Sequence, residues 1–330
     1  MAIFKDFFNN VRTLLFPQSS VELGSLLPTL PRKYFTSIDE LPFHPVPELD
    51  LANAWWCAEA AMLAYHETTK VIELTAGLSE AGWQLQTFGD QLRTYAVLLR
   101  SSKVAILAFR GTRVRGFRTV QEVFTQPPVK FADLRTDFAF IPKNFPRGGI
   151  VHEGFLEAAD EFWTIYGKQI VELVGSRECF VTGHSLGAAL ATVAAQLIAH
   201  VRALYTYGSP RVGNGAFRNL FLPESPPTFR FVHGLDLITT IPPEGVLEFT
   251  HVGDILHIRG DGSGVDQQEH SLVDVLANST TLPIPVIRDA VVNLFEGRLV
   301  QPLTVLIPRN ALADHAPIFY VEKLRKLALH

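Results

Sequence analysis

Short apolar runs alternate with longer alanine-rich or amphipathic stretches through the middle of the chain. Val104–Phe109 and Cys179–Thr182 are compact and rich in apolar residues, which predicts strands covered on both faces of a sheet. Leu186–Ala199 is nearly all Ala, Leu and Val, with no Gly or Pro after Gly187, which predicts a helix. Similar patterns predict strands at Trp83–Phe88, Thr94–Arg100, Ala203–Tyr207, Thr228–His233 and Asp254–Arg259, and helices at Ala52–His66 and from Val151 to Tyr166. This alternation indicates one α/β domain with a mostly parallel sheet.

Residues 1–47 follow a different pattern. Their apolar residues recur at steps of three and four and then give way to a proline-rich, irregular stretch from Pro28 to Pro47. The first part predicts an amphipathic helix, which either packs on its own domain or lies on a membrane or lipid surface. The apolar face of this helix comprises Ile3, Phe4, Phe7, Phe8, Val11, Leu14 and Leu15.

Composition narrows the class of protein. A formal net charge of -4 over 330 residues, without a basic stripe, argues against a nucleic-acid partner. The two cysteines, Cys57 and Cys179, are too few for a disulfide framework, so both are expected to be reduced. Polar residues interrupt the first residues of the chain, which therefore lack the pattern of a signal peptide. No apolar run approaches the length of a membrane-spanning helix. Both observations favour an intracellular or lipid-surface protein. Secretion stays open if a leader was removed.

Gly183-His184-Ser185-Leu186-Gly187 joins the predicted strand to the predicted helix and fits G-x-S-x-G. Such a turn holds the serine in a strained conformation and exposes its Oγ at the carboxyl end of the strand. The N–H of Leu186 then lies at a helix N-terminus, where partial positive charge favours an oxyanion. A chance match in an ordinary turn is the alternative, but the strand before and the helix after favour Ser185 as a nucleophile.

Several motifs appear in order and point to one family. After the apolar strand at Val104–Phe109, Thr112 can offer a second N–H to an oxyanion, although a plain strand-end turn would look alike. The chain resembles the class 3 (fungal-type) lipases, a branch of the α/β-hydrolases, almost continuously from Ala52 to Gly260. The motifs that carry this resemblance are Phe109–Thr112, Val151–Phe155, Gly183–Gly187, Tyr207–Asn214 and Arg230–Asp236 with Pro242-Pro243.

The resemblance implies a catalytic triad and an oxyanion hole. Ser185 would be the nucleophile and Asp236 the acid, with Thr112 and Leu186 as the oxyanion donors; by itself, Asp236 could also be a turn former. The base is sought among the histidines that follow Asp236. His315, in a loop five residues before Tyr320, resembles the closing motif of the family, and His270 is the second choice. His251 and His257 are interpreted as structural, and the remaining candidate is the terminal His330.

Two segments depart from a compact α/β-hydrolase. Residues 113–136 mix aromatic and charged residues after the oxyanion turn, which predicts a lid or, alternatively, a surface loop with a short helix. Just beyond them, Asp137 resembles an acid of the family, and it is expected to support the oxyanion loop rather than to act directly in catalysis. Residues 264–309 form an insertion before His315, and one predicted helical face within it comprises Ile284, Ile287, Val291, Leu294 and Phe295.

The resemblance therefore predicts a serine hydrolase that cleaves lipid esters, most simply an acylglycerol lipase. Phospholipase A1, a broad carboxylesterase and a catalytically inactive lipid-binding module stay open as alternatives. No cofactor or metal is expected, because His and Cys are too scattered for a zinc site and no P-loop or dinucleotide fingerprint occurs. The sequence gives no indication of the oligomeric state.

Overall fold

The computed structural model describes residues 32–89, 94–111, 141–222, 226–242, 248–277, 284–285 and 314–330. The predicted N-terminal helix, Thr112, the candidate lid, Asp137 and most of the insertion at 264–309 lie outside the described residues.

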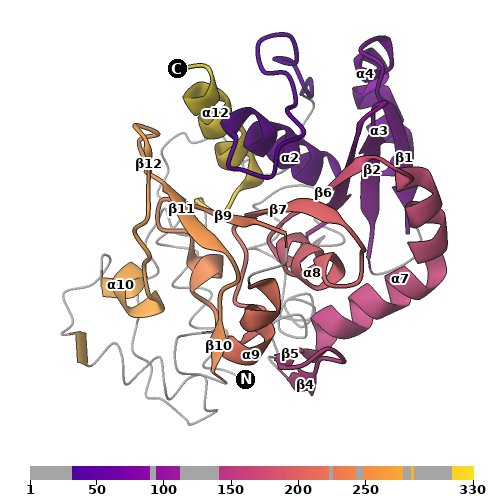
Figure 1. Ribbon diagram of the computed structural model, residues 1–330. Helices are drawn as coiled ribbons and strands as arrows, with labels where there is room; N and C mark the ends of the chain where they lie inside the picture. Colours follow the sequence, from indigo (N-terminus) through magenta and orange to yellow (C-terminus); the bar gives the residue numbers. More distant parts are fainter. Residues whose placement is uncertain are drawn as a thin grey trace, which may run out of the picture.

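An eight-stranded sheet runs through the described part of the chain in the order β1-β2-β3-β6-β7-β9-β11-β12 (Figure 1). The five strands from β3 to β11 are parallel, whereas β1, β2 and β12 pair antiparallel at the two edges. The mostly parallel sheet predicted from the sequence is confirmed. The strands are β1 (Gln84–Phe88), β2 (Ala96–Arg100), β3 (Val104–Phe109), β6 (Glu178–His184), β7 (Val201–Tyr207), β9 (Thr228–His233), β11 (Asp254–Ile258) and β12 (Val265–Asp266).

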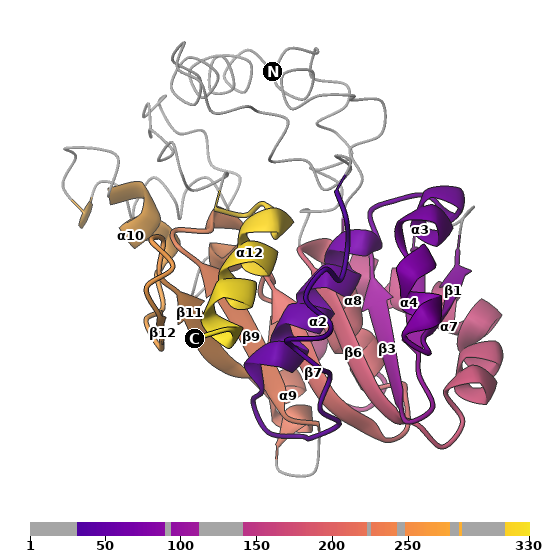
Figure 2. The same ribbon diagram turned by 90° about the horizontal axis from the view of Figure 1, so that it is seen from above.

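Helices cover both faces of this sheet. On one face α2 (Leu51–Leu63) and α12 (Pro317–Ala328) lie side by side, and on the other are α7 (Glu153–Val174) and α8 (Leu186–Ala195) (Figures 1 and 2). Successive strand residues point to opposite faces, so Ile106 joins the core beneath α2 while Leu107 joins the core beneath α8. The apolar run of β3 is therefore explained by burial on both sides. Shorter helices are α3 (Thr68–Leu74), α4 (Ala76–Glu80), α9 (Gly215–Arg218) and α10 (Leu272–Ala277), with 3-10 turns η3 (Asn219–Phe221) and η4 (Leu237–Thr240).

A second, small antiparallel sheet was not predicted. Its strands run in the order β10 (Phe249–Thr250), β8 (Gly213–Asn214), β5 (Ile150–His152) and β4 (Pro142–Asn144). Two or three residues are too few to show a strand periodicity in a sequence. For this reason the helix expected from Val151 in fact begins at Glu153, and the two residues before it belong to β5.

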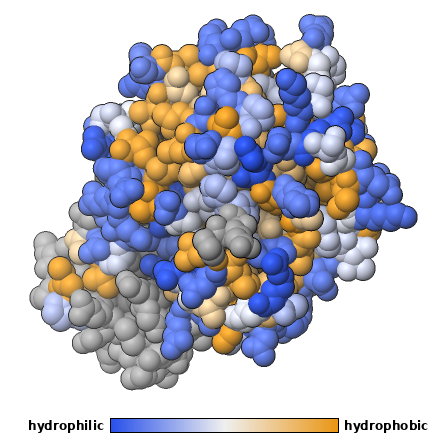
Figure 3. Space-filling model, viewed as in Figure 1, coloured by the Kyte–Doolittle hydropathy of each residue, from blue (hydrophilic) through white to orange (hydrophobic). Residues whose placement is uncertain are grey.

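Among the described residues, most large apolar side chains lie in the two cores. On the face seen in Figure 3, hydrophobic residues form patches among hydrophilic ones. In the described part of the chain, the most exposed large apolar side chains, such as Leu222 at 65% and Ile72 at 59%, lie far apart in the sequence. Single exposed apolar residues of this kind are normal for a folded domain.

Residues 32–50 contain turns and bends but no helix or strand, and they pack on α2. Phe35 lies against Trp55 and Trp56, with ring centroids 6.3 and 5.0 Å apart. Arg32 reaches the buried Glu59 of α2, and Nη2 is 2.9 Å from Oε1. This ion pair ties the beginning of the described chain to the helix that covers the centre of the sheet.

The free energy of unfolding should fall between pH 5 and pH 8, and replacing Glu59 by Gln should make this fall smaller. Burial raises the pKa of the Glu59 carboxyl to about 7 from its ordinary value of 4.5, although Arg32 opposes the change. Because the folded-state pKa is the higher one, the free energy of unfolding falls as pH rises between these values, by about 3 kcal/mol. Guanidinium unfolding at pH 5 and pH 8 should show a smaller decrease for Glu59→Gln. The exposed Glu73, which pairs with Lys70, provides the control Glu73→Gln, and an unchanged decrease in Glu59→Gln would contradict the expectation.

Candidate active site

Ser185 stands at a sharp turn between β6 and α8. Its φ of 59° and ψ of -128° are unusual for a residue with a side chain and cost about 1–3 kcal/mol. The turn is held by a bond from Ser185 N–H to the Tyr207 carbonyl oxygen of β7 at 2.9 Å. Strand and helix approach so closely that a Cβ on Gly183 would lie 2.2 Å from the Gly187 carbonyl oxygen. A Cβ on Gly187 would in turn lie 2.2 Å from the Phe109 carbonyl oxygen, so packing requires both glycines.

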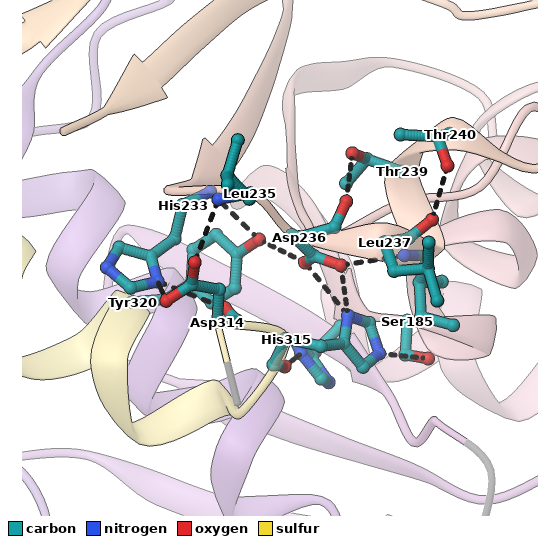
Figure 4. Close-up of polar contacts among 12 residues, drawn as sticks. Ser185, His233, Leu235, Asp236, Leu237, Thr239, Thr240, Asp314, His315 and Tyr320 are labelled. Carbon is teal, nitrogen blue, oxygen red and sulfur yellow. Dashed lines mark hydrogen bonds and ion pairs between the residues drawn. The ribbon is translucent and has the colours of Figure 1, made fainter. Parts of the chain in front are cut away.

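Three side chains from distant parts of the sequence meet at this turn (Figure 4). His315 Nε2 lies 2.8 Å from Ser185 Oγ, and His315 Nδ1 lies 2.9 Å from each carboxylate oxygen of Asp236. Since a carboxylate only accepts, Nδ1–H donates to Asp236 and Nε2 is left to accept from the serine hydroxyl. Ser185 follows β6, Asp236 follows β9, and His315 lies just before α12. The carboxyl ends of parallel strands thus bring Ser185 and Asp236 together, and the residues before α12 add His315.

Asp236 is held as an anion. Burial alone would raise the pKa of its carboxyl, but the contact with His315 and the Tyr320 hydroxyl outweigh burial and lower that pKa below its ordinary value. The Tyr320 hydroxyl donates to Oδ2 at 2.6 Å, and the Ile238 N–H donates to Oδ1 at 2.9 Å. The second bond is the turn-forming contact that the sequence left open as an alternative, and it coexists with the contact to His315.

The structure separates the histidines that were candidates for the base. His270 packs against His257, with ring centroids 5.3 Å apart, and it is His315 whose ring reaches Ser185. His251 donates through Nε2 to the Thr239 carbonyl oxygen at 2.8 Å. His257 bonds the Gly234 carbonyl oxygen, and His330 is exposed at the end of the chain.

A buried Tyr–His pair lies behind His315 and was missed in the sequence. His184 donates through Nε2 to the His315 carbonyl oxygen at 2.7 Å and accepts through Nδ1 from the Tyr65 hydroxyl at 2.8 Å. Burial and the neighbouring His315 lower the pKa of His184 to about 3, so this ring stays neutral. The two imidazoles lie 4.6 Å apart, and of the two it is His315 that reaches Ser185 Oγ. No sequence signal links Tyr65 to a residue more than a hundred positions away.

The predicted oxyanion donors are only partly described. Leu186 is the first residue of α8, where backbone N–H groups have no acceptor within the helix. Thr112 lies outside the described residues, but Gly111 directly before it packs on the turn at Ser185. A Cβ on Gly111 would lie 1.9 Å from the Tyr65 hydroxyl and 2.7 Å from the His184 carbonyl oxygen. The role of Thr112 stays a prediction.

The described residues contain no group of three or more His, Cys, Asp or Glu side chains that could hold a metal ion. Within the same residues, no helix combines the length and apolar character that crossing a membrane would need.

Comparison with known proteins finds similarity to lipases and to a phospholipase A1. The family model described as Lipase (class 3) matches residues 106–246, which include Ser185 and Asp236. The chain is 42% identical over 102 residues to a secreted mono- and diacylglycerol lipase of Fusarium solani, covering 28% of this chain and 30% of that protein. It is 30% identical over 185 residues to a lipase of Rhizopus niveus, covering 52% and 43%. A phospholipase A1 of Arabidopsis thaliana is 43% identical over 68 residues, covering 19% and 15%. The chain thus spans less than half the length of these relatives.

Solved structures share the fold. Lipase II of Rhizopus niveus superposes with a TM-score of 0.51 and 25% identity, covering 68% of this chain and 92% of that one. The triacylglyceride lipase of Rhizomucor miehei superposes with a TM-score of 0.52 and 21% identity, covering 77% and 93%. The second likeness bears on the fold alone, which is the α/β-hydrolase fold predicted from the sequence.

Replacing Gly208 by Ala should lower the reactivity of Ser185 while the protein still folds. Gly208 has a φ of +57°, and an added Cβ would lie 2.7 Å from Asp236 Oδ2 and 2.9 Å from His315 Nδ1. These contacts are too short, so Asp236 or His315 would have to move. A misplacement of about 1 Å at a reacting pair costs about 10²-fold in rate, and the rate at which a fluorophosphonate labels Ser185 would measure this loss.

Gly82→Ala is the matched control for the backbone of Gly208, because Gly82 has a φ of +79° and open space around its Cβ position. Both variants should lose about 1–2 kcal/mol of stability, since both place alanine at a positive φ. Only Gly208→Ala should lose labelling. Equal labelling rates in the two variants would contradict the geometry described for Asp236 and His315.

Proposed function

We propose that this chain, which belongs to the class 3 lipase family, is a serine hydrolase that cleaves carboxylic esters of lipids. The observation that carries this function is the line of hydrogen bonds from Ser185 Oγ through the His315 imidazole to the Asp236 carboxylate. A hydroxyl becomes a good nucleophile when a base stands within hydrogen-bond reach and a third group orients that base.

In the first step, His315 Nε2 takes the Ser185 proton as Oγ attacks the ester carbonyl carbon. Asp236 stabilises the imidazolium that forms, because its carboxylate already accepts from Nδ1–H. The neighbouring His184 remains neutral and does not compete for the proton. His315 then protonates the leaving alcohol as the carbon–oxygen bond breaks, which leaves an acyl group on Ser185.

In the second step, water attacks the acyl-enzyme and His315 again acts as the base. The carboxylic acid leaves, and Ser185 recovers its proton. In both steps negative charge develops on the carbonyl oxygen, for which we propose the N–H groups of Leu186 and Thr112 as donors. Loss of one such donor costs about 3 kcal/mol in comparable enzymes. The position of Leu186 at the start of α8 adds the favourable end of the helix dipole.

The proposed substrate class is acylglycerols. The relatives named as lipases, one of them a mono- and diacylglycerol lipase, support this class. Phospholipase A1 is the second candidate, and the Arabidopsis relative of that name favours it. The same three side chains would serve either substrate, because the chemistry concerns the ester carbonyl and not the rest of the lipid. Secretion is compatible with the name of the Fusarium relative.

Labelling by a fluorophosphonate tests the nucleophile. The folded protein should be labelled, and Ser185→Ala should lose at least about 10³-fold of labelling and ester turnover, because the attacking oxygen is gone. Ser263→Ala, at an exposed serine of the turn after β11, should match the wild type. Absence of labelling in the folded wild type would instead favour a catalytically inactive lipid-binding module.

Turnover of p-nitrophenyl esters of increasing chain length, beside triglyceride emulsions and phospholipid vesicles, separates the substrate classes. We expect long-chain esters and triglyceride emulsions to be the better substrates. A preference for phospholipid vesicles would identify a phospholipase A1, and turnover restricted to short soluble esters would exclude a lipase.

Attachment to a lipid surface is proposed from the sequence of residues 1–16, which lie outside the described residues. The apolar stripe of this segment has the spacing of an interfacial helix. Deletion of residues 1–16 should weaken co-sedimentation with lipid vesicles several-fold and leave turnover of p-nitrophenyl butyrate unchanged. Unaltered co-sedimentation would show that this helix serves another purpose.

A further inference from the structure

The proposed function requires His315 to meet Asp236, although the two lie 79 positions apart. Asp236 is fixed by the turn that follows β9, whereas His315 stands just before α12. A reacting pair of this kind loses about 10²-fold in rate when one partner moves by roughly 1 Å. The contacts that join the two segments therefore decide the activity.

Two of these contacts are made one residue before His315, by Asp314. Its Oδ2 accepts from the Leu235 N–H at 2.8 Å, and its backbone oxygen accepts from His233 Nδ1–H at 3.0 Å (Figure 4). Leu235 in turn stands one residue before Asp236. The bond between Asp314 and Leu235 thus joins the immediate neighbours of the proposed base and of the proposed acid.

The backbone next to this bond, at Gly234, leaves space for the Asp314 carboxylate. Gly234 has a φ of +52°, and a Cβ added there would lie 2.4 Å from Asp314 Oδ2 and 2.8 Å from Cγ. Any larger residue at this position would have to displace the Asp314 side chain. Glycine here serves two needs, the left-handed backbone and the space that Asp314 occupies.

The charge of Asp314 has a cost that plain packing would not require. Its side chain is only 17% exposed, and burial raises the pKa of the carboxyl despite the Leu235 N–H and His233 beside it. An apolar residue would fill the same space without that cost. The acceptor oxygen, and not the volume of the side chain, is therefore what this position uses.

We infer that Asp314 is a positioning residue: its carboxylate, bonded to the Leu235 N–H, holds His315 in register with Asp236. This role rests on the proposed function for its effect on turnover, since the register of His315 affects kcat only if His315 acts as the base. It is separate from the roles of the three reacting side chains, because Asp314 contacts none of their functional groups.

Other contacts should keep the fold intact when Asp314 is changed. The Phe319 ring stacks on His233 with centroids 5.4 Å apart, and the Tyr320 hydroxyl accepts from the His233 N–H at 3.1 Å. Tyr320 also donates to Asp236 from the first turns of α12. Changes at Asp314 should therefore alter the position of His315 more than the docking of α12.

The first experiment compares Asp314→Leu with Asp314→Asn. Leu has a similar size but no acceptor, whereas Asn keeps an oxygen that can accept from the Leu235 N–H. For p-nitrophenyl butyrate, kcat should fall about 10²-fold in Asp314→Leu and only a few-fold in Asp314→Asn, with KM unchanged in both. Asp261→Leu is the control, because the exposed Asp261 accepts from the Ser263 N–H at 2.9 Å away from the site.

Equal kcat values in Asp314→Leu and the wild type would overturn the inference, as would an equal loss in the Leu and Asn variants. The second experiment adds Gly234→Ala. In the wild type the new methyl group must displace the Asp314 carboxylate, so kcat should fall strongly. In an Asp314→Ala background the space is free, and Gly234→Ala should lower kcat little further. Additive losses would contradict the inference.

A spectroscopic measurement keeps this inference distinct from the proposed function. The proton that His315 Nδ1 donates to Asp236 should give a low-field proton NMR signal in the wild type and in Asp314→Asn. Asp314→Leu should lose it. If the signal behaves in this way but the wild type hydrolyses no ester, the function is wrong and the positioning role stands. If the wild type hydrolyses esters and Asp314→Leu keeps the signal, the positioning role is wrong and the function stands.

Discussion

The contact between His315 and Ser185 depends on a backbone that is forced into a tight turn at the end of β6. Ser185 can adopt its strained conformation because Gly183 and Gly187 allow β6, α8 and β3 to approach within distances that a Cβ would prevent. The strain is offset by the packing of α8 against the sheet and by the bond from Ser185 to β7. The serine hydroxyl is thereby held in one place, and every other group of the site is arranged relative to it.

Around that hydroxyl, the site is a set of neutral and charged groups with distinct tasks. Asp236 remains an anion because His315 and the Tyr320 hydroxyl stabilise its charge against burial. His184 remains neutral because burial disfavours its cation, and it fixes the backbone of His315 through a single N–H. Of the two facing imidazoles, only His315 lies between a hydroxyl and a carboxylate.

Much of this arrangement could be predicted from the sequence. The apolar run of β3 and the alanine-rich α8 have strong local patterns, and the G-x-S-x-G motif places Ser185 between a strand and a helix. The sequence could not reveal Tyr65 or the contact between Asp314 and Leu235, because neither depends on local spacing. The strands of the second sheet were not predicted for another reason, because segments of two or three residues show no hydrophobic periodicity. Local propensity thus predicted the longer elements, and only the folded chain shows which side chains meet across them.

The central claim is that His315, and not the other candidate His270, is the base for Ser185. The most direct measurement is the rate of fluorophosphonate labelling in His315→Ala and His270→Ala, each checked for cooperative unfolding. The geometry predicts that labelling is lost by at least about 10³-fold in His315→Ala and is unchanged in His270→Ala. Labelling that persists in His315→Ala, or that disappears in His270→Ala, would contradict this account.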